Sequence, residues 1–256
     1  MGVAGAAIAT VIGQFCGMCI GIYCNLKKNK EIQFSFKRMR FDGETVKEIY
    51  VVGVPSILMM SIGSIMTYGM NKILLGFSST AAAVFGVYFK LQSFFFMPVF
   101  GLNNSLVPII AYNYGARNKA RIMRTVKLGC GAAVTILVLG AIVFQTMPAT
   151  LLRMFNASED MISIGVTALR IISLSFLLAG FCIVIGSVFQ ALGNGMYSLI
   201  TSVCRQLLVL LPVAYIFAHM FGLHAVWWSF PVSELASLAA SVYLLKRIYN
   251  SHLRDL

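Results

Sequence analysis

The chain has 256 residues, of which 59% are hydrophobic and only 11% are charged, and its formal net charge is +12. A soluble domain carries roughly 25% charged residues, so this composition excludes a soluble helical protein, whose helices would need polar faces. Apolar segments of about 20 residues or more recur, and each can cross a hydrocarbon core of roughly 30 Å. The sequence therefore predicts an all-α integral membrane protein whose partner is the lipid bilayer.

Seven hydrophobic segments are predicted to form transmembrane helices. They cover residues 2–24, 49–76, 80–112, 124–151, 161–191, 196–220 and 223–247. The longest of them exceed the width of a bilayer and must tilt or kink. All six prolines fall within or at the ends of these segments, where each removes a backbone donor and loosens its helix.

The first predicted helix contains two patterns of small residues. Gly13, Gly17 and Gly21 are spaced four apart, which favours close packing against another helix. Cys16 and Cys19 form a CxxC pair, but their apolar setting is unsuited to zinc or redox chemistry. We therefore expect no metal site. The sequence also has no HExxH pattern, phosphate-binding loop or nucleophile elbow, which argues against an enzyme.

The basic residues lie mainly in three connecting segments. They are Lys27, Lys28, Lys30, Lys37, Arg38, Arg40 and Lys47 in the first, Arg117, Lys119, Arg121, Arg124 and Lys127 in the second, and Lys246, Arg247 and Arg254 in the tail. This is the positive-inside pattern of a multi-pass membrane protein and not a nucleic-acid groove. It predicts that segments 25–48 and 113–123 and the tail are cytoplasmic, with 76–80 and 153–160 on the opposite side.

Two adjacent acids, Glu159 and Asp160, follow Ser158 at the start of the fifth predicted helix. Two acids outside a membrane could form an ion port. A serine N-cap followed by acids also suits the positive end of a helix dipole, and we favour this interpretation.

Polar side chains recur at helical spacing inside the hydrophobic segments. A charge at mid-bilayer costs about 2.5–3.5 kcal/mol, so it normally faces the bundle interior or a wet cavity. We therefore predict a substrate or ion pathway lined by Tyr68, Asn71, Lys90, Gln92, Asn103, Asn104, Arg170, Arg205 and Glu234. The alternative is that Lys90, Arg170 and Arg205 snorkel to the membrane surface or cap carbonyl groups.

Aromatic rings and thioethers in the same segments suit a cavity for large flat cations. The candidates are Met66, Tyr68, Met70, Phe94 and Phe95, and the alternative is that each of them faces lipid.

Several stretches, taken in order, resemble the multidrug and toxic compound extrusion (MATE) transporters. MPVFGLNNSLVPIIAYNYGARN at 97–118 resembles the eighth helix of that family. The others are GVAGAAIATVIGQ at 2–14 for the sixth helix, VGVPS at 52–56 for the seventh, VFQALGNG at 188–195 for the tenth, RQLLVLLP at 205–212 for the eleventh and FPVSELASLAASVYLLKR at 230–247 for the twelfth. The ordered set covers essentially the whole chain.

The resemblance implies a two-lobe inverted-access transporter with two pseudo-symmetric six-helix lobes. On that pattern, residues 1–26 are a transmembrane helix of the preceding lobe, 27–48 a basic cytoplasmic connector, and 49–256 the C-terminal six-helix lobe with its tail. The N-terminal lobe would be missing from this chain. Because such transporters rock one repeat against the other around a shared site, we expect the chain alone not to transport.

The resemblance also implies a multidrug-type secondary antiporter in the bacterial plasma (inner) membrane. It would export small organic cations or drugs in exchange for sodium ions or protons, with no cofactor besides the coupling ion. The acid that the family places in its first helix has no counterpart here, and Glu234 is the only acid inside any predicted membrane segment. The identity of the ion therefore stays open.

Three alternative functions compete with an antiporter. A lipid-linked oligosaccharide flippase of related fold needs a more cationic cavity, which Lys90 and Arg170 could supply. A seven-helix retinal protein needs a lysine within the last helix, but none occurs there before Lys246 at its cytoplasmic end. A membrane enzyme would have a single buried acid and no intramembrane histidine near it for acid–base chemistry. We therefore expect a transporter that is neither an enzyme nor a nucleic-acid-binding protein.

Overall fold

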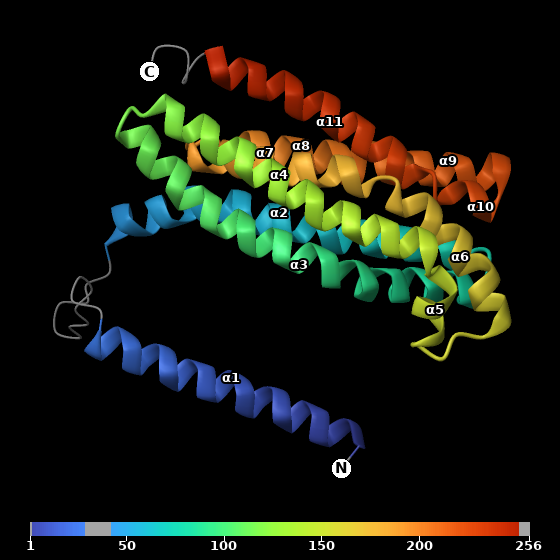
Figure 1. Ribbon diagram of the computed structural model, residues 1–256. Coiled ribbons are helices and arrows are strands. Elements are labelled where there is room, and N and C mark those ends of the chain that lie inside the picture. Colours follow the sequence, from blue (N-terminus) through green and yellow to red (C-terminus); the bar gives the residue numbers. More distant parts are fainter. Residues whose placement is uncertain (1, 29–41, 251–256) are drawn as a thin grey trace. The chain divides into compact units, whose positions relative to one another are not determined.

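The computed structural model describes residues 2–28 and 42–250, and every regular element in these two ranges is helical (Figure 1). The elements are α1 (Gly2–Lys27), α2 (Gly43–Leu75), α3 (Ser79–Gly115), α4 (Lys119–Thr146), α5 (Pro148–Arg153), α6 (Glu159–Ser173), α7 (Phe176–Ala191), α8 (Gly195–Val203), the π-helix η2 (Cys204–Leu210), α9 (Leu211–Phe221), α10 (Leu223–Val226) and α11 (Ser229–Ile248). The predicted all-α fold is confirmed.

Contacts divide the chain into two units, Met1–Ile49 and Tyr50–Leu256. The first unit contains α1, whose large apolar side chains are mostly exposed. The predicted packing of its glycine face against another helix stays a prediction. Of the predicted 27–48 connector, residues 29–41 lie outside the described residues, as do residues 251–256 of the predicted tail.

Four helical stretches are long and apolar enough to span a membrane. They are Ala7–Lys27, α3, α4 and the Gly195–Phe221 stretch that comprises α8, η2 and α9. A fifth span arises if α6 and α7, which are bent by 49°, are counted together. The other two of the seven predicted segments correspond to α2 and α11, which are helical but do not pass this test among the described residues.

Three predicted helices, 124–151, 161–191 and 223–247, are broken in the structure, the last of them between α10 and α11. The first ends at Thr146, and Pro148 begins the short α5. Proline has no N–H group with which to continue the α4 hydrogen-bond ladder, and it is well suited to the first turn of a new helix. The break between α4 and α5 therefore has a visible cause in the sequence.

The bend between α6 and α7 is held by side-chain hydrogen bonds. Gln145 Nε2 of α4 donates to the carbonyl oxygen of Arg170 at 2.7 Å and to Ser173 Oγ at 2.9 Å. Ser175 Oγ donates to the carbonyl oxygen of Ile172 at 2.6 Å. A bend leaves carbonyl groups without their helical partners, and in an apolar setting these must be satisfied by neighbouring groups. Gln145 and Ser175 supply such partners, and so does Ser173, whose Oγ donates to the carbonyl oxygen of Arg170 at 2.9 Å.

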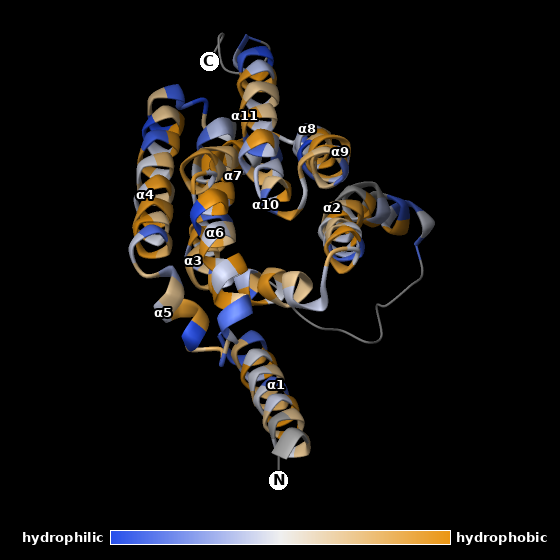
Figure 2. Cartoon of the chain, turned by 90° about the vertical axis from the view of Figure 1, so that its right-hand side faces the viewer, coloured by the Kyte–Doolittle hydropathy of each residue, from blue (hydrophilic) through white to orange (hydrophobic). Residues whose placement is uncertain are grey.

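The core of the second unit lies where α3, α4 and α7 pack together. Phe96, Phe144 and Phe176 come from these three helices and are buried. The ring centroids of Phe96 and Phe144 each lie 5.2 Å from that of Phe176. Figure 2 shows α2 on the far side of α3 and α7 from α4, so α2 lies away from this aromatic core.

The start of α6 confirms the capping interpretation of Ser158. Ser158 Oγ accepts a hydrogen bond from the Met161 N–H at 3.3 Å, and Glu159 and Asp160 occupy the first turn. Both acids therefore lie at the positive end of the α6 dipole.

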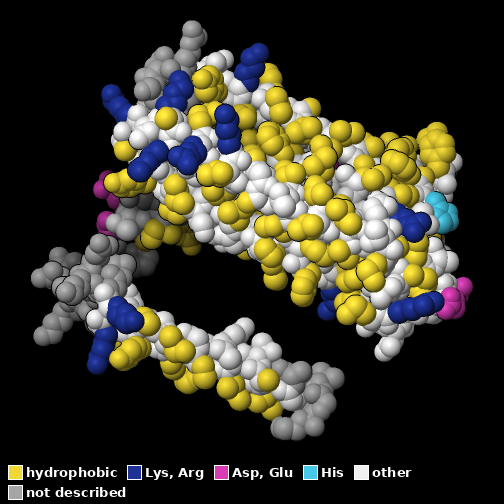
Figure 3. Space-filling view, in the orientation of Figure 1, with side chains coloured by type: hydrophobic (Ala, Val, Ile, Leu, Met, Phe, Trp, Pro, Cys, Tyr) yellow, Lys and Arg dark blue, Asp and Glu magenta, His cyan; other side chains and the backbone are white. Residues whose placement is uncertain are grey.

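The turns of the second unit gather at two ends (Figure 1). The α2–α3 turn and the α5–α6 loop lie at one end, and the α3–α4 turn and the end of α11 lie at the other. At the latter end, Lys119 Nζ is 5.2 Å from the centroid of the Tyr249 ring. Figure 3 shows lysine and arginine side chains gathered most densely around this end. This arrangement is the one that the predicted topology requires.

Cysteine labelling would test that topology. In a variant whose six cysteines are replaced by alanine, cysteines introduced at Ser78 and Ala157 are expected to react with a membrane-impermeant maleimide on intact cells. Cysteines at Asn118 and Asn250 are expected to react only after the cells are opened, because the positive-inside rule predicts that the basic end faces the cytoplasm. The opposite labelling pattern would overturn the orientation.

Candidate functional site

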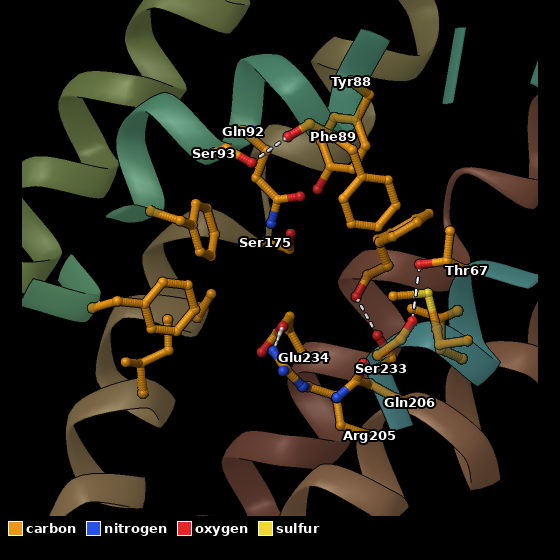
Figure 4. A pocket seen from close by; sticks show the side chains of 18 of the residues that line it. Thr67, Tyr88, Phe89, Gln92, Ser93, Ser175, Arg205, Gln206, Ser233 and Glu234 are labelled. Atoms are coloured by element: carbon orange, nitrogen blue, oxygen red, sulfur yellow. Dashed lines mark hydrogen bonds and ion pairs between the residues drawn. The ribbon is translucent and has the colours of Figure 1, made fainter. Parts of the chain in front are cut away.

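A cavity of about 420 Å³ lies among α2, α3, the α6–α7 bend, η2 and α11 (Figure 4). Its apolar lining is largely aromatic and sulfur-containing, and includes Met66, Phe89, Phe96, Met97, Phe100 and Phe230. Thr67, Gln92, Ser93, Ser175, Gln206 and Ser233 add hydroxyl and amide groups. A mostly apolar cavity of this size with a few polar groups is typical of a small-molecule site.

One ion pair lies in the wall of this larger cavity. Arg205 Nη1 of η2 donates to Glu234 Oε1 of α11 at 2.6 Å. The two side chains are 27% and 10% exposed, respectively, and Glu234 Oε2 is buried without a hydrogen-bond partner. Of the described residues that line the cavity, these two alone carry a formal charge, so their charges cancel. Figure 4 shows them facing Gln92 and Tyr88 across the cavity.

The π-helix η2 positions Arg205 at this site. Pro212 follows in the first turn of α9, and proline cannot donate to the carbonyl four residues before it. Just before this point the chain adopts the wider π-helix over Cys204–Leu210. Such segments are rare and occur frequently at functional sites. Two consecutive residues, Arg205 and Gln206, line the cavity from it.

A smaller cavity of about 130 Å³ adjoins the larger one. Phe100, Ile183 and Arg205 line both cavities and therefore stand between them. The remaining polar lining of the smaller cavity is uncharged and consists of Asn103, Gln190, Ser198, Thr201, Ser202, Ser237 and Ser241. Asn103 Oδ1 accepts a hydrogen bond from Ser187 Oγ, and Gln190 Nε2 donates to Ser198 Oγ at 3.2 Å.

The structure gathers only part of the predicted pathway. Gln92, Arg205 and Glu234 line the larger cavity, and Asn103 and Arg205 line the smaller one. Five predicted residues line neither: Tyr68, Lys90, Asn104 and Arg170, which are exposed, and Asn71, which is half-buried. Lys90 lies two residues from both Tyr88 and Gln92, and this spacing places it on a different face of α3. A role in transport stays a prediction for all nine residues.

The aromatic lining was only partly anticipated. Met66 lines the larger cavity, whereas Phe94 is exposed and the Phe95 ring packs against Phe144 at 5.9 Å. Sequence reasoning missed Phe89, Phe96 and Phe100, although their spacing, with that of Tyr88 and Gln92, is compatible with one broad helix face. It also missed Gln206, because on an ideal α-helix adjacent residues point about 100° apart.

The MatE family model matches residues 55–216. Among curated proteins, the multidrug export protein MepA of Staphylococcus saprophyticus is 29% identical over 249 residues, which cover 96% of this chain and 55% of that protein. MepA of Staphylococcus haemolyticus is 26% identical, with 97% of this chain and 54% of that protein covered. The chain thus spans about half the length of the curated relatives it matches.

Solved structures share the fold. The MATE multidrug transporter DinF-BH in complex with rhodamine 6G is 35% identical, with a TM-score of 0.84 over 99% of this chain and 57% of that chain. An outward-facing multidrug resistance MATE family transporter of the MOP superfamily has a TM-score of 0.86 over 100% of this chain and 58% of that chain. Its identity of 23% supports a shared fold and no more.

Proposed function

The chain belongs to the MatE family, and on that basis we propose that it forms one lobe of a secondary antiporter that exports small organic cations or drugs. The coupling ion would be sodium or a proton, and the membrane would be the bacterial plasma membrane. Two relatives are named multidrug export proteins, and a third was solved with rhodamine 6G. These names and that complex support the proposal for this chain.

The main support for this proposal is the lining and size of the larger cavity. Its phenylalanine rings offer negative faces to a flat cation, and its two methionine sulfurs are polarizable and adaptable. Glu234 supplies the only carboxylate among its described lining residues. A volume of about 420 Å³ suits a drug-sized molecule, which such sites bury largely in apolar contacts.

The flippase alternative rests on a cationic cavity, for which Lys90 and Arg170 were the candidates. Both are exposed, and neither lines the cavity. The single guanidinium that does line it, that of Arg205, is paired with a carboxylate. A cavity whose charges cancel is poorly suited to a pyrophosphate, so we prefer an organic cation as the substrate.

Dye binding tests the proposal directly. Residues 1–256 in nanodiscs are expected to bind rhodamine 6G and ethidium, detected as a rise in fluorescence anisotropy. Phe100→Ala is expected to weaken binding roughly three- to tenfold, because it removes a ring face from the cavity. Phe94→Ala is the matched control, since Phe94 is 83% exposed and lines neither cavity. Absence of dye binding, or equal effects of the two variants, would refute a cation site here.

Transport requires a second experiment. In a chimera, residues 1–256 replace the matching 57% of DinF-BH. Vesicles that contain this chimera are expected to move ethidium when a sodium or proton gradient is imposed. Separate gradients of the two ions identify the coupling ion. Vesicles with residues 1–256 alone are expected to bind ethidium but not to move it, because alternating access needs two repeats. Failure of the chimera to respond to either gradient would refute antiport.

A further inference from the structure

We propose that Arg205 acts as a built-in competitor for the substrate. In the protein without substrate, the Arg205 guanidinium is paired with the Glu234 carboxylate. An organic cation that binds in the larger cavity displaces the guanidinium into the smaller cavity. The inference rests on the proposed function and adds a regulatory contact within the same site. It makes Arg205 a residue that determines specificity, through a movement between two cavities that it already borders.

The Glu234 carboxylate has one oxygen with no hydrogen-bond partner. Its side chain is only 10% exposed, and Oε1 alone has a partner, the Arg205 guanidinium at 2.6 Å. Oε2 is buried with no partner. An ionised carboxylate offers about four lone-pair sites, and leaving such sites empty in an apolar setting is unfavourable. A cation that enters from the larger cavity would compete with Arg205 for this incompletely satisfied carboxylate.

The smaller cavity offers hydrogen-bond acceptors to a displaced Arg205 side chain. Its side chain is 27% exposed and borders the smaller cavity, where amide and hydroxyl oxygens of Asn103, Ser202 and Ser237 are within the same lining. A guanidinium has five N–H donors, and amide and hydroxyl oxygens can accept hydrogen bonds from them. The described lining of the smaller cavity has no carboxylate, so the pair with Glu234 is preferred until another cation takes the carboxylate.

This exchange would select for charge. An uncharged ligand in the larger cavity gains nothing from Glu234 and leaves Arg205 in place. A cation takes the carboxylate and releases Arg205, whose guanidinium then donates to the amide and hydroxyl oxygens of the smaller cavity. The cavity can then be neutral when empty and still favour cations. The ligand class that fits is a lipophilic monovalent cation, because the surrounding walls are aromatic.

Three variants of residues 1–256 in nanodiscs test the exchange with rhodamine 6G as the probe. Arg205→Gln removes the competitor and is expected to tighten binding about tenfold. Glu234→Gln removes the negative charge, leaves the guanidinium in the cavity wall and is expected to weaken binding about tenfold. Ser202→Leu fills the smaller cavity while the ion pair stays intact, and it is also expected to weaken binding about tenfold. Arg121→Gln, in the exposed first turn of α4, is the charge control and is expected to change nothing.

Two further measurements separate this inference from a loss of folding or of the cavity. The uncharged dye Nile red is expected to bind all three variants as it binds the wild type, which separates charge competition from collapse of the cavity. If size-exclusion chromatography shows that a variant of the ion pair does not fold, Ser202→Leu decides, because it leaves the pair in place. A wild-type chain that binds no cationic dye overturns both this inference and the proposed function. Wild-type binding of rhodamine 6G that Arg205→Gln weakens, or that Ser202→Leu leaves unchanged, overturns this inference alone.

Discussion

Replacing Glu234 with leucine is expected to destabilise the second unit by about 3 kcal/mol, because it leaves the Arg205 guanidinium without its carboxylate. Breaking a buried pair by removing one partner costs roughly 3–5 kcal/mol. The lower end of that range applies, since the Arg205 side chain is 27% exposed and borders a polar cavity. For a unit of this size, such a loss lowers the Tm by about 10 °C.

The double variant Arg205→Met/Glu234→Leu is the decisive comparison. Replacing a buried pair with apolar side chains of similar volume is often neutral or stabilising, so its Tm is expected to return close to that of the wild type. Thermal unfolding followed by size-exclusion chromatography measures both variants in the same detergent. If the double variant is as unstable as Glu234→Leu, packing of the carboxylate stem and not the unpaired charge is responsible.

That recovery would also say why the pair exists. A pair that can be replaced without loss of stability is not required for folding, and its presence in a cavity wall is then better explained by ligand binding. The stability of the double variant and dye binding by the single variants therefore both test whether the Arg205–Glu234 pair serves ligand binding and not folding.

How far the sequence predicts this site depends on the signal that each residue gives. Glu234 and Arg205 were predicted as pathway residues because a charge in a membrane segment must face protein or water. Their pairing was not predicted. It depends on the register of η2, where the π-helix changes the facing of Arg205 and Gln206 relative to an ideal helix. Pro212 signals an irregularity there, but proline alone does not specify a π-helix.

For Lys90 and Arg170, the expectation that a charge in a membrane segment lines a cavity did not identify cavity residues. A charge in a long hydrophobic segment predicts a polar environment, yet both side chains are exposed on the surface of the second unit. The sequence does not reveal which face of a helix meets its neighbours when several faces carry polar residues. Two of the helix breaks, α4–α5 and α6–α7, differ in whether the nearby sequence signals them. Pro148 signals one, whereas the α6–α7 bend depends on Gln145, which is distant in sequence.

The close approach of α3 and α4 supports a second prediction about stability. A methyl group added at Gly140 of α4 would lie 2.8 Å from Cγ and 3.2 Å from Cβ of Phe95 on α3. These atoms lie near the α3 backbone and cannot rotate away as the end of a flexible side chain can. The Phe95 ring is itself held against Phe144, with their centroids 5.9 Å apart. Only glycine therefore permits the observed separation of the two helices.

Gly140→Ala is expected to destabilise the second unit by about 1–3 kcal/mol, the usual effect of overpacking a core. Gly131→Ala is the matched control on the same helix, because a methyl group there meets nothing within 4 Å. Alanine favours a helix over glycine by about 0.5–1 kcal/mol, so the control is expected to raise the Tm slightly. The two substitutions are chemically identical and should shift the Tm in opposite directions. Shifts of the same sign would mean that helix propensity, and not the contact with Phe95, sets the stability of α4.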